Sequence, residues 1–403
     1  MSQRLTLACA LCLVLSFASR VAAEAPPRLT SFASKHYDVH TNLAMDKARE
    51  MAAHMDAVFE EYTKRFVAFG KGTTPRMPLY LLRTQKEYLA FMQSKSVDAT
   101  GTGGIFFIRP DAKGLATWVE DRPSWITLET LQHEGFHQFA YACIGTKLPL
   151  WVNEGMAEYF GDAILVDKRL RVGICPNRRV QAIKQALAEG KTFEFDELLA
   201  MQPGKWHQTL VRSPERGRLQ YDQSWSMVYF LIHGDDGRYR AAFEKYLSVV
   251  AKGMDSTTAF KHAFGATDTL AFRRQWEKFV AMVEPDPIDT AVGRMRFLAQ
   301  GLQLLHERRE SPPRSLDELR KKLSEIGFRA VRIENGVRTE VSASDASLYI
   351  FAKDNGSIAT FDIVRSDEKG VPPGARATGL QPQPTLTWTR DEKGELLAEV
   401  DFR

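Results

Sequence analysis

Two histidines and a glutamate stand at a spacing typical of a metal site, in the stretch HEGFH at residues 133–137. On a helix, side chains four residues apart project from the same face, so His133 and His137 can share one metal ion. Glu134 lies about 100° round the helix from His133, near enough to reach a water molecule at that metal. The pattern therefore predicts a zinc site with a general base beside it.

A catalytic zinc ion takes three protein ligands and keeps a fourth position open, so one ligand must come from outside this helix. Glu154 is the leading candidate, because Gly145 and Pro149 let a second helix pack back on the first. Its apolar neighbours would make an unpaired carboxylate costly there. Glu158, one turn further on, is the alternative ligand, although we expect it to hydrogen-bond a ligand histidine instead. His207 is the only other histidine that merits a test.

The N-terminus has the order of a secretory signal peptide. Arg4 precedes an apolar stretch over residues 5–17, and small residues precede a cleavage site after Ala23. Removing residues 1–23 takes away Arg4 and Arg20 and no acids, which lowers the net charge from +4 to +2. That charge is too small to predict a nucleic-acid partner. No other apolar run reaches spanning length, so we expect an exported, water-soluble protein that is secreted or periplasmic.

Two cysteines, Cys143 and Cys175, remain after signal cleavage. In an oxidising compartment they can pair, which would tie the metal helix to the segment after the second helix. Two buried free thiols are an equally good reading, because the sequence does not give their separation. Both alternatives stay open.

The 403 residues allow two or three domains. Hydrophobic periodicity predicts a small N-terminal sheet, whose strand at residues 114–120 could pair at its edge with an extended peptide. Gly135, in mid-helix, predicts close approach of another element. The expected elements before the linker are strands at 34–42, 77–82, 105–108 and 114–120, a loop at 205–220, and helices at 44–69, 85–93, from 127, 150–160, 177–190, 221–233, 237–250 and 257–283.

Residues 284–287, EPDP, form the clearest linker. After them we expect an accessory domain at residues 290–403, made of helices and an antiparallel sheet, whose role the sequence does not indicate. Its elements would be helices at 290–307 and from the capping box at Ser315 to Gly327, then strands at 329–333, 337–341, 348–352, 358–364, 385–389 and 396–402, with a loop at 370–384. The fold class is therefore α+β.

HEGFH followed by LPLWVNEGMAEYF resembles the gluzincin zinc metallopeptidases, in which a second helix supplies a glutamate. The chain is similar to an uncharacterised family of predicted secreted bacterial gluzincins, domain of unknown function 1570. The resemblance covers roughly residues 30–283, and it implies a thermolysin-like catalytic domain with an N-terminal mixed sheet and a helical subdomain. It also implies zinc bound by His133, His137 and Glu154, with Glu158 supporting a histidine.

Tyr221 lies 67 residues after Glu154, a distance comparable to that of a tyrosine which stabilises the oxyanion in gluzincin aminopeptidases. The resemblance implies that role for Tyr221, while a tyrosine packed in the core is the alternative. The Gly-x-Met-Glu-Asn segment with which those aminopeptidases hold a free amine has no counterpart here. The resemblance therefore implies a peptidase and does not extend to aminopeptidase specificity.

Two hypotheses follow. The first is an exported zinc metallopeptidase whose partner is a peptide or protein substrate, with Glu134 as general base. The second is a catalytically silent binding or scaffolding protein that keeps the fold and binds zinc structurally. An intact Glu134 favours the first, because a structural site has no use for a base beside an open position. Hydrolysis of a non-peptide substrate is a third reading, and the oligomeric state is not indicated.

Overall fold

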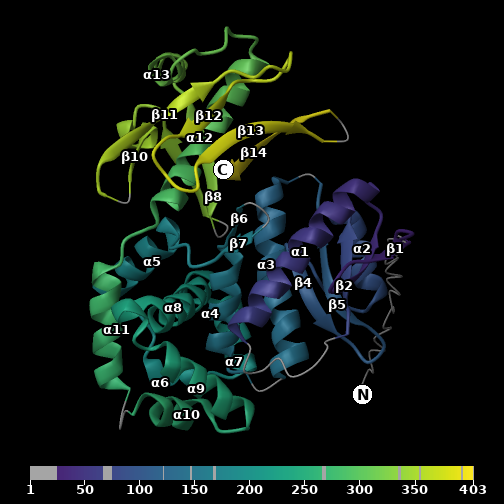
Figure 1. Ribbon diagram of the computed structural model, residues 1–403, viewed down its shortest axis with the longest axis vertical. Helices are drawn as coiled ribbons and strands as arrows, with labels where there is room; N and C mark the ends of the chain where they lie inside the picture. The colour runs from purple at the N-terminus through teal and green to yellow at the C-terminus, as the bar shows by residue number, and fades with distance from the viewer. Residues whose placement is uncertain are drawn as a thin grey trace, which may run out of the picture.

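The computed structural model describes residues 25–66, 75–120, 122–145, 148–166, 169–265, 269–334, 337–353, 355–391 and 394–402. The predicted signal peptide, residues 1–23, lies outside the described residues, as does the end of the first predicted helix at 67–69. Figure 1 shows the arrangement of the chain. Its elements before the linker are β1 (Thr30–Ala33), β2 (Tyr37–Thr41), α1 (Met45–Arg65), β3 (Met77–Leu82), α2 (Gln85–Ser94), β4 (Gly104–Ile108), β5 (Lys113–Trp118), α3 (Ser124–Phe139), the π-helix η1 (Ala140–Ile144), α4 (Leu150–Gly161), β6 (Ile164–Val166), β7 (Arg169–Arg171), α5 (Asn177–Ala188), α6 (Phe195–Leu199), α7 (Pro203–Arg212), α8 (Pro214–His233), η2 (Gly234–Gly237), α9 (Arg240–Ala251), α10 (Ser256–Phe264) and α11 (Leu270–Met282).

The N-terminal part is a five-stranded mixed sheet in the order β1-β2-β3-β5-β4, parallel in its middle and antiparallel at both ends. β5 is buried on both faces. Its Leu115 joins the core formed with α1 and α3, whereas Ala116 and Trp118 pack beneath α2. The helix predicted at 44–69 is α1, and it buries one face that includes Met51, Met55 and Tyr62.

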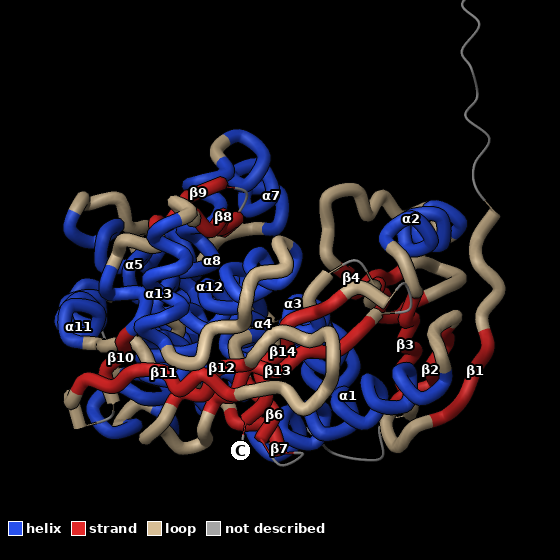
Figure 2. The backbone as a smooth tube through the Cα atoms, turned by 90° about the horizontal axis from the view of Figure 1, so that it is seen from above, coloured by secondary structure: helices blue, strands red, loops and turns tan. Residues whose placement is uncertain are grey.

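α3 lies between this sheet and a group of helices that includes α4, α5 and α8 (Figures 1 and 2). The sheet and the helices share one hydrophobic core, which runs from Tyr37 to Val280. The fold is therefore mixed α and β, consistent with the predicted α+β class. Among the described residues, no helix is both long enough and apolar enough to cross a membrane.

The residues after 284–287 have a hydrophobic core of their own, built around Phe297, Leu298 and Phe351. They form a five-stranded antiparallel sheet in the order β10-β11-β12-β13-β14 and a hairpin of β8 and β9. The backbone N–H of Asp286 donates to the carbonyl of Cys175 at 2.8 Å, which fixes the linker against the first unit. The elements are α12 (Pro287–Glu307), α13 (Leu316–Glu325), β8 (Arg329–Glu334), β9 (Val337–Ser342), η3 (Ala346–Tyr349), β10 (Ile350–Ala352), β11 (Ile358–Val364), β12 (Gly374–Ala377), β13 (Pro384–Arg390) and β14 (Leu396–Phe402).

Two predicted loops were wrong. Residues 205–220 belong to α7 and α8, each of which begins with a proline, and Ser213 caps α8 by accepting from the backbone N–H of Arg216. Proline at the first helical position favours a helix start, because that position needs no backbone donor. The loop at 370–384 contains β12, whose Ala375 and Ala377 are buried between neighbouring strands.

Other differences are smaller. The helix predicted at 257–283 is two helices, because Gly265 adopts a left-handed conformation with φ of 66° and ends α10. The short strands β1, β6 and β7 were not predicted, and residues 346–349 form η3 before β10. Cys143 and Cys175 are not joined by a disulfide; Cys175 is buried, whereas Cys143 is half-buried.

The predicted peptide-pairing edge was also wrong. β5 carries no free edge, because it pairs with β3 on one side and with β4 on the other. The strand at residues 114–120 was taken for an edge from its alternation, but burial on both faces marks an inner strand. β4 is the edge strand on this side of the sheet.

Two glycines allow helices to approach closely. A Cβ atom on Gly155 would lie 2.5 Å from the carbonyl oxygen of Ser224 on α8, so α4 and α8 cross in contact at this point. A Cβ atom on Gly135 would lie 2.7 Å from the terminal methyl of Met55, which confirms the predicted close approach. The first neighbour is backbone and cannot rotate away, whereas the second is the end of a flexible side chain.

We expect Gly155→Ala to lower the free energy of unfolding by about 1–3 kcal/mol, because the methyl group must push α8 away from α4. Urea denaturation followed by circular dichroism measures the effect. Gly293→Ala is the matched control, because nothing lies within 4 Å of a Cβ there and α12 gains helix propensity. Equal stability of the two variants would contradict the close crossing.

Candidate metal centre

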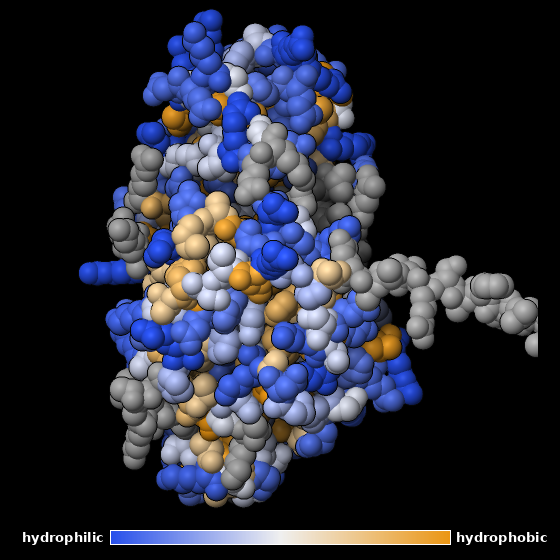
Figure 3. All heavy atoms as spheres, turned by 90° about the vertical axis from the view of Figure 1, so that its right-hand side faces the viewer, coloured by the Kyte–Doolittle hydropathy of each residue, from blue (hydrophilic) through white to orange (hydrophobic). Residues whose placement is uncertain are grey.

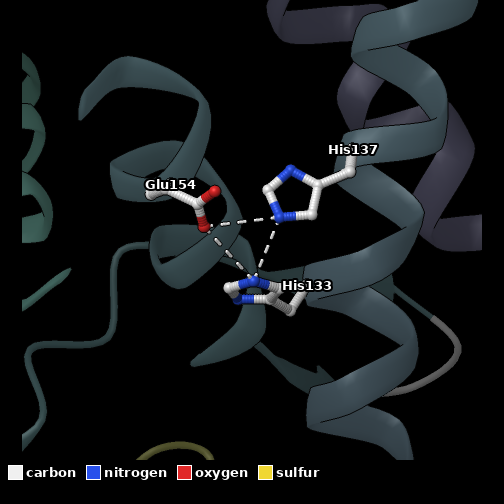
Figure 4. A group of neighbouring side chains, drawn as sticks. All are labelled: His133, His137 and Glu154. Carbon is white, nitrogen blue, oxygen red and sulfur yellow. Dashed lines mark hydrogen bonds and ion pairs between the residues drawn. The ribbon is translucent and has the colours of Figure 1, made fainter. Parts of the chain in front are cut away.

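His133 and His137 on α3 and Glu154 on α4 point toward one another (Figure 4). The two Nε2 atoms are 3.1 Å apart, and Glu154 Oε2 lies 3.7 Å from that of His133 and 3.5 Å from that of His137. Among the residues that the structure describes, these three form the group able to hold a metal ion. The predicted ligand set is thus brought together, while His207 is exposed on α7 and outside the group.

Gln132 holds the two helices in this arrangement. Its carboxamide nitrogen donates to the carbonyls of Phe160, Gly161 and Ala163, at 2.8, 3.1 and 2.9 Å. These carbonyls lie at the end of α4 and just after it, where a backbone carbonyl has no N–H partner within the helix. The carboxamide oxygen of Gln132 lies 3.0 Å from His54 on α1, so the residue before His133 links three helices.

The geometry and charge of the group fit zinc. Ligand atoms about 2.0–2.2 Å from a tetrahedral zinc ion would lie about 3.3–3.6 Å apart, close to the separations found here. Burial alone would lower the pKa of His137, but the carboxylates of Glu154 and Glu134 raise it to about 9. Burial opposes a charge on His133 as well, and Glu158 outweighs burial and raises its pKa. The space between the three converging side chains therefore favours a positive charge.

Glu158 lies behind His133, one turn after Glu154 on α4. Its Oε2 is 3.8 Å from Nδ1 of His133, the nitrogen that faces away from the other ligands. The same carboxylate pairs with the guanidinium of Arg179, which is 4% exposed. Burial would raise the pKa of Glu158, but Arg179 and His133 lower it well below its usual range, so this carboxylate stays ionised.

Arg179 on α5 joins three carboxylates. Besides Glu158, its Nε donates to Asp162 at 2.8 Å and its Nη1 to Asp222 at 3.0 Å. Asp162 follows α4 and Asp222 lies on α8, so one buried cation connects three helices. Burial would lower the pKa of Arg179, and the three carboxylates raise it, which keeps the guanidinium charged.

Glu134 is not one of the converging ligands. Its Oε2 accepts a hydrogen bond of 2.8 Å from the backbone N–H of Phe106 on the edge strand β4. Glu134 and His133 both line a pocket of about 230 Å³, whose other walls include Gly104 and Arg178. The carboxylate is therefore held beside the ligand cluster, in the wall of this pocket.

Tyr221 stands on α8, next to Asp222, which Arg179 holds. Its ring lies edge-on to Trp206, with 5.2 Å between the ring centroids. Burial raises the pKa of Tyr221, and the charge of Glu154 raises it further, so the phenol remains protonated and can donate. Tyr221 is not among the residues that line the pocket beside His133.

Sequence reasoning missed Arg179, Asp162, Asp222 and the contact with Phe106. Arg179 had a signal, because it shares the buried face of α5 with Ile183 and Ala186 at helical spacing. A charge on an apolar face requires buried partners. The Phe106 contact could not be predicted from residue types, because its donor is a backbone N–H.

A family model described as a protein of unknown function (DUF1570) matches residues 127–253. The match runs from α3 into the turn after α9, and it includes the metal group, Glu134, Glu158 and Tyr221. Similarity to that family is therefore found over this segment, which is less than half of the chain. No curated protein matches the chain.

We expect His133→Ala, His137→Ala and Glu154→Ala each to abolish stable zinc binding, because each removes one of three ligands. Glu158→Ala should weaken zinc affinity only about 10–100-fold, since it removes a group that orients His133. Arg179 keeps Asp162 and Asp222 as partners in that variant. Zinc content after dialysis, with circular dichroism as the control for folding, gives the ranking. Loss of zinc in Glu158→Ala together with its retention in Glu154→Ala would reverse the ligand assignment.

Proposed function

We propose that this chain is an exported zinc metallopeptidase of the gluzincin class, with a thermolysin-like catalytic unit over residues 30–283 and an accessory unit over 290–403. The observation that carries the proposal is the convergence of His133, His137 and Glu154 with a separate carboxylate, Glu134, beside them. A structural zinc site is closed by four protein ligands, whereas a catalytic one has three. Three ligands are found here among the described residues. The signal-like N-terminus of the sequence supports export, in a secreted or periplasmic protein.

When bound, zinc would act as a Lewis acid that lowers the pKa of water and polarises the scissile carbonyl. Glu134 accepts a proton from the attacking water and donates it to the amine that leaves as the C–N bond breaks. The N–H of Phe106 keeps the Glu134 carboxylate oriented during both transfers. Tyr221 donates a hydrogen bond to the carbonyl oxygen as negative charge develops there.

The edge strand β4 supports a peptide substrate in particular. Unpaired backbone groups on an edge strand can bind an extended chain by adding it to the sheet. β4 begins at Gly104, which also lines the pocket beside Glu134. A peptide added there would lie next to the base.

The second candidate is a catalytically silent scaffolding protein with structural zinc. Glu134 disfavours it, since its carboxylate is not among the three converging side chains and instead accepts a hydrogen bond from the backbone of β4. The two candidates differ in one measurable property, which is turnover by a zinc-loaded protein.

The test uses Glu134→Gln. The glutamine oxygen can still accept from Phe106, so we expect the variant to fold and to bind about as much zinc as the native protein. Its turnover of peptides should fall by at least about 10²–10⁴-fold, the contribution of a general base. Mass spectrometry of a broad peptide library measures cleavage and preference together. A fully zinc-loaded native protein that cleaves no peptide in such a library would support the scaffolding reading instead.

Tyr221→Phe separates a catalytic from a packing role. The ring that packs on Trp206 is kept and only the hydroxyl is lost. We expect kcat to fall by about 10²–10³-fold with little change in KM, as for the loss of one oxyanion donor. Steady-state kinetics on one cleaved peptide measures both constants. Unchanged kcat would assign Tyr221 to the core.

A further inference from the structure

A large cleft of about 2520 Å³ lies between the accessory unit and the first unit. The units also contact each other there, since Ser124 on α3 hydrogen-bonds Glu399 on β14 and Arg296 on α12 pairs with Glu129 on α3. Its walls come from α1 and the start of α3 on one side, and from α12, β13 and β14 on the other. Glu129, Asp162 and Arg178 line both this cleft and the pocket beside His133. The cleft therefore adjoins the pocket of the candidate metal centre, with these three side chains between them.

The cleft is acidic although the chain is not. Among the described residues that line it, twelve are Asp or Glu and six are Lys or Arg, a formal difference of −6. The whole chain has a formal net charge of +4. Low-dielectric walls lined by one sign of charge focus the field and concentrate ligands of the opposite sign. This charge favours a cationic occupant and disfavours nucleic acid.

A strand edge forms one wall of the same cleft. β14 (Leu396–Phe402) is an end strand of its sheet and pairs only with β13 among the described strands. All seven of its residues line the cleft, although successive side chains of a strand point to opposite faces. That pattern is expected when the edge of the strand meets the cavity. An edge about 23 Å long with unpaired backbone groups is a template for an extended peptide.

The surface around the cleft offers apolar contact as well as charge. Figure 3 shows one side of the molecule, with mostly hydrophilic side chains over the accessory unit and a group of hydrophobic ones near mid-height, where the two units meet. Leu396, Leu397 and Phe402 of β14 are half-buried in the cleft wall. A polypeptide with both basic and apolar side chains fits these walls better than a small polyamine does.

We propose that the cleft binds an extended, positively charged polypeptide as an added strand on β14, and that this polypeptide is the substrate class of the neighbouring metal centre. The second clause rests on the proposed peptidase function, whereas the binding itself does not. The accessory unit then selects substrates by charge, and the cleft adjoins the pocket beside His133 at Glu129 and Asp162.

Binding is measured with zinc-loaded Glu134→Gln, which prevents cleavage during the titration. The probes are a fluorescent twelve-residue peptide of alternating Lys and Val and its counterpart with Glu in place of Lys, followed by anisotropy. We expect the cationic peptide to bind at least tenfold more tightly, and the difference to shrink as salt is added. N-methylation of alternate backbone nitrogens in the cationic peptide should weaken binding at least tenfold, because strand addition needs those donors.

Two triple variants complete the test. Glu50, Glu307 and Glu395 line the cleft, and their replacement by Gln should weaken binding of the cationic peptide at least fivefold. Glu215, Glu244 and Glu325 are exposed acids outside it, and the same replacement there should change binding less than twofold. Equal binding of the two peptides, equal effects of the two triple variants, or indifference to N-methylation would overturn the proposal. A concentration-dependent dimer that buries the cleft in analytical ultracentrifugation would also overturn it.

Failure of this inference is distinguishable from failure of the proposed function. A native protein that cleaves the peptide library without preference for Lys or Arg, and whose Glu134→Gln form binds both probes alike, keeps its peptidase function and loses the cleft proposal. A protein that binds the cationic probe in the cleft but cleaves nothing keeps the binding site and loses the substrate assignment.

Discussion

The arrangement of the candidate site depends on one buried cation, the guanidinium of Arg179. It pairs with Glu158 on α4, with Asp162 beyond the end of that helix and with Asp222 on α8. A carboxylate left in this interior without a partner would be strongly destabilising, and so would the guanidinium alone. The network therefore fixes the relative position of α4, α5 and α8. Glu154 and Tyr221 are placed near one another by helices that this single charge connects.

A second, uncharged set of contacts fixes α3 against α4. Gln132 saturates the carbonyls at the end of α4, and Phe136 stacks on Phe160 with 5.4 Å between ring centroids. Gly155 removes the side chain that would separate α4 from α8. Once these contacts fix α3 against α4, helix geometry alone places His133 and His137. Their position is a property of the core more than of the metal group itself.

These contacts explain what the sequence could predict. The spacing of His133 and His137 is local, so helix geometry alone gives it, and Glu154 followed from the need for a third ligand. Glu158 near His133 could be expected for the same reason. The partners of Arg179 come from segments up to 43 residues apart, and no local pattern relates them. A charged residue on the buried face of a helix is expected to have buried partners, but the sequence does not identify them.

Elements with a strong hydrophobic periodicity could be predicted from the sequence. Elements whose start or end depends on a single proline or glycine could not. α1, α3, α4 and the strands of the C-terminal sheet other than β12 follow their hydrophobic patterns. Pro214 lies inside the loop predicted at 205–220, although proline also begins helices. β5 was read as an edge because alternation alone does not distinguish a strand with one solvated face from one that packs two different cores. Strand order is a non-local property, so it had to come from the structure.

The bond from Phe106 to Glu134 has an evolutionary consequence. The donor is a backbone N–H, so every amino acid except proline supplies it at position 106. Side chains of β4 can then change without loss of the contact that orients Glu134, the base of the proposed mechanism. Sequence identity along β4 does not report on this contact, because the contact needs a strand at this place and no particular residue.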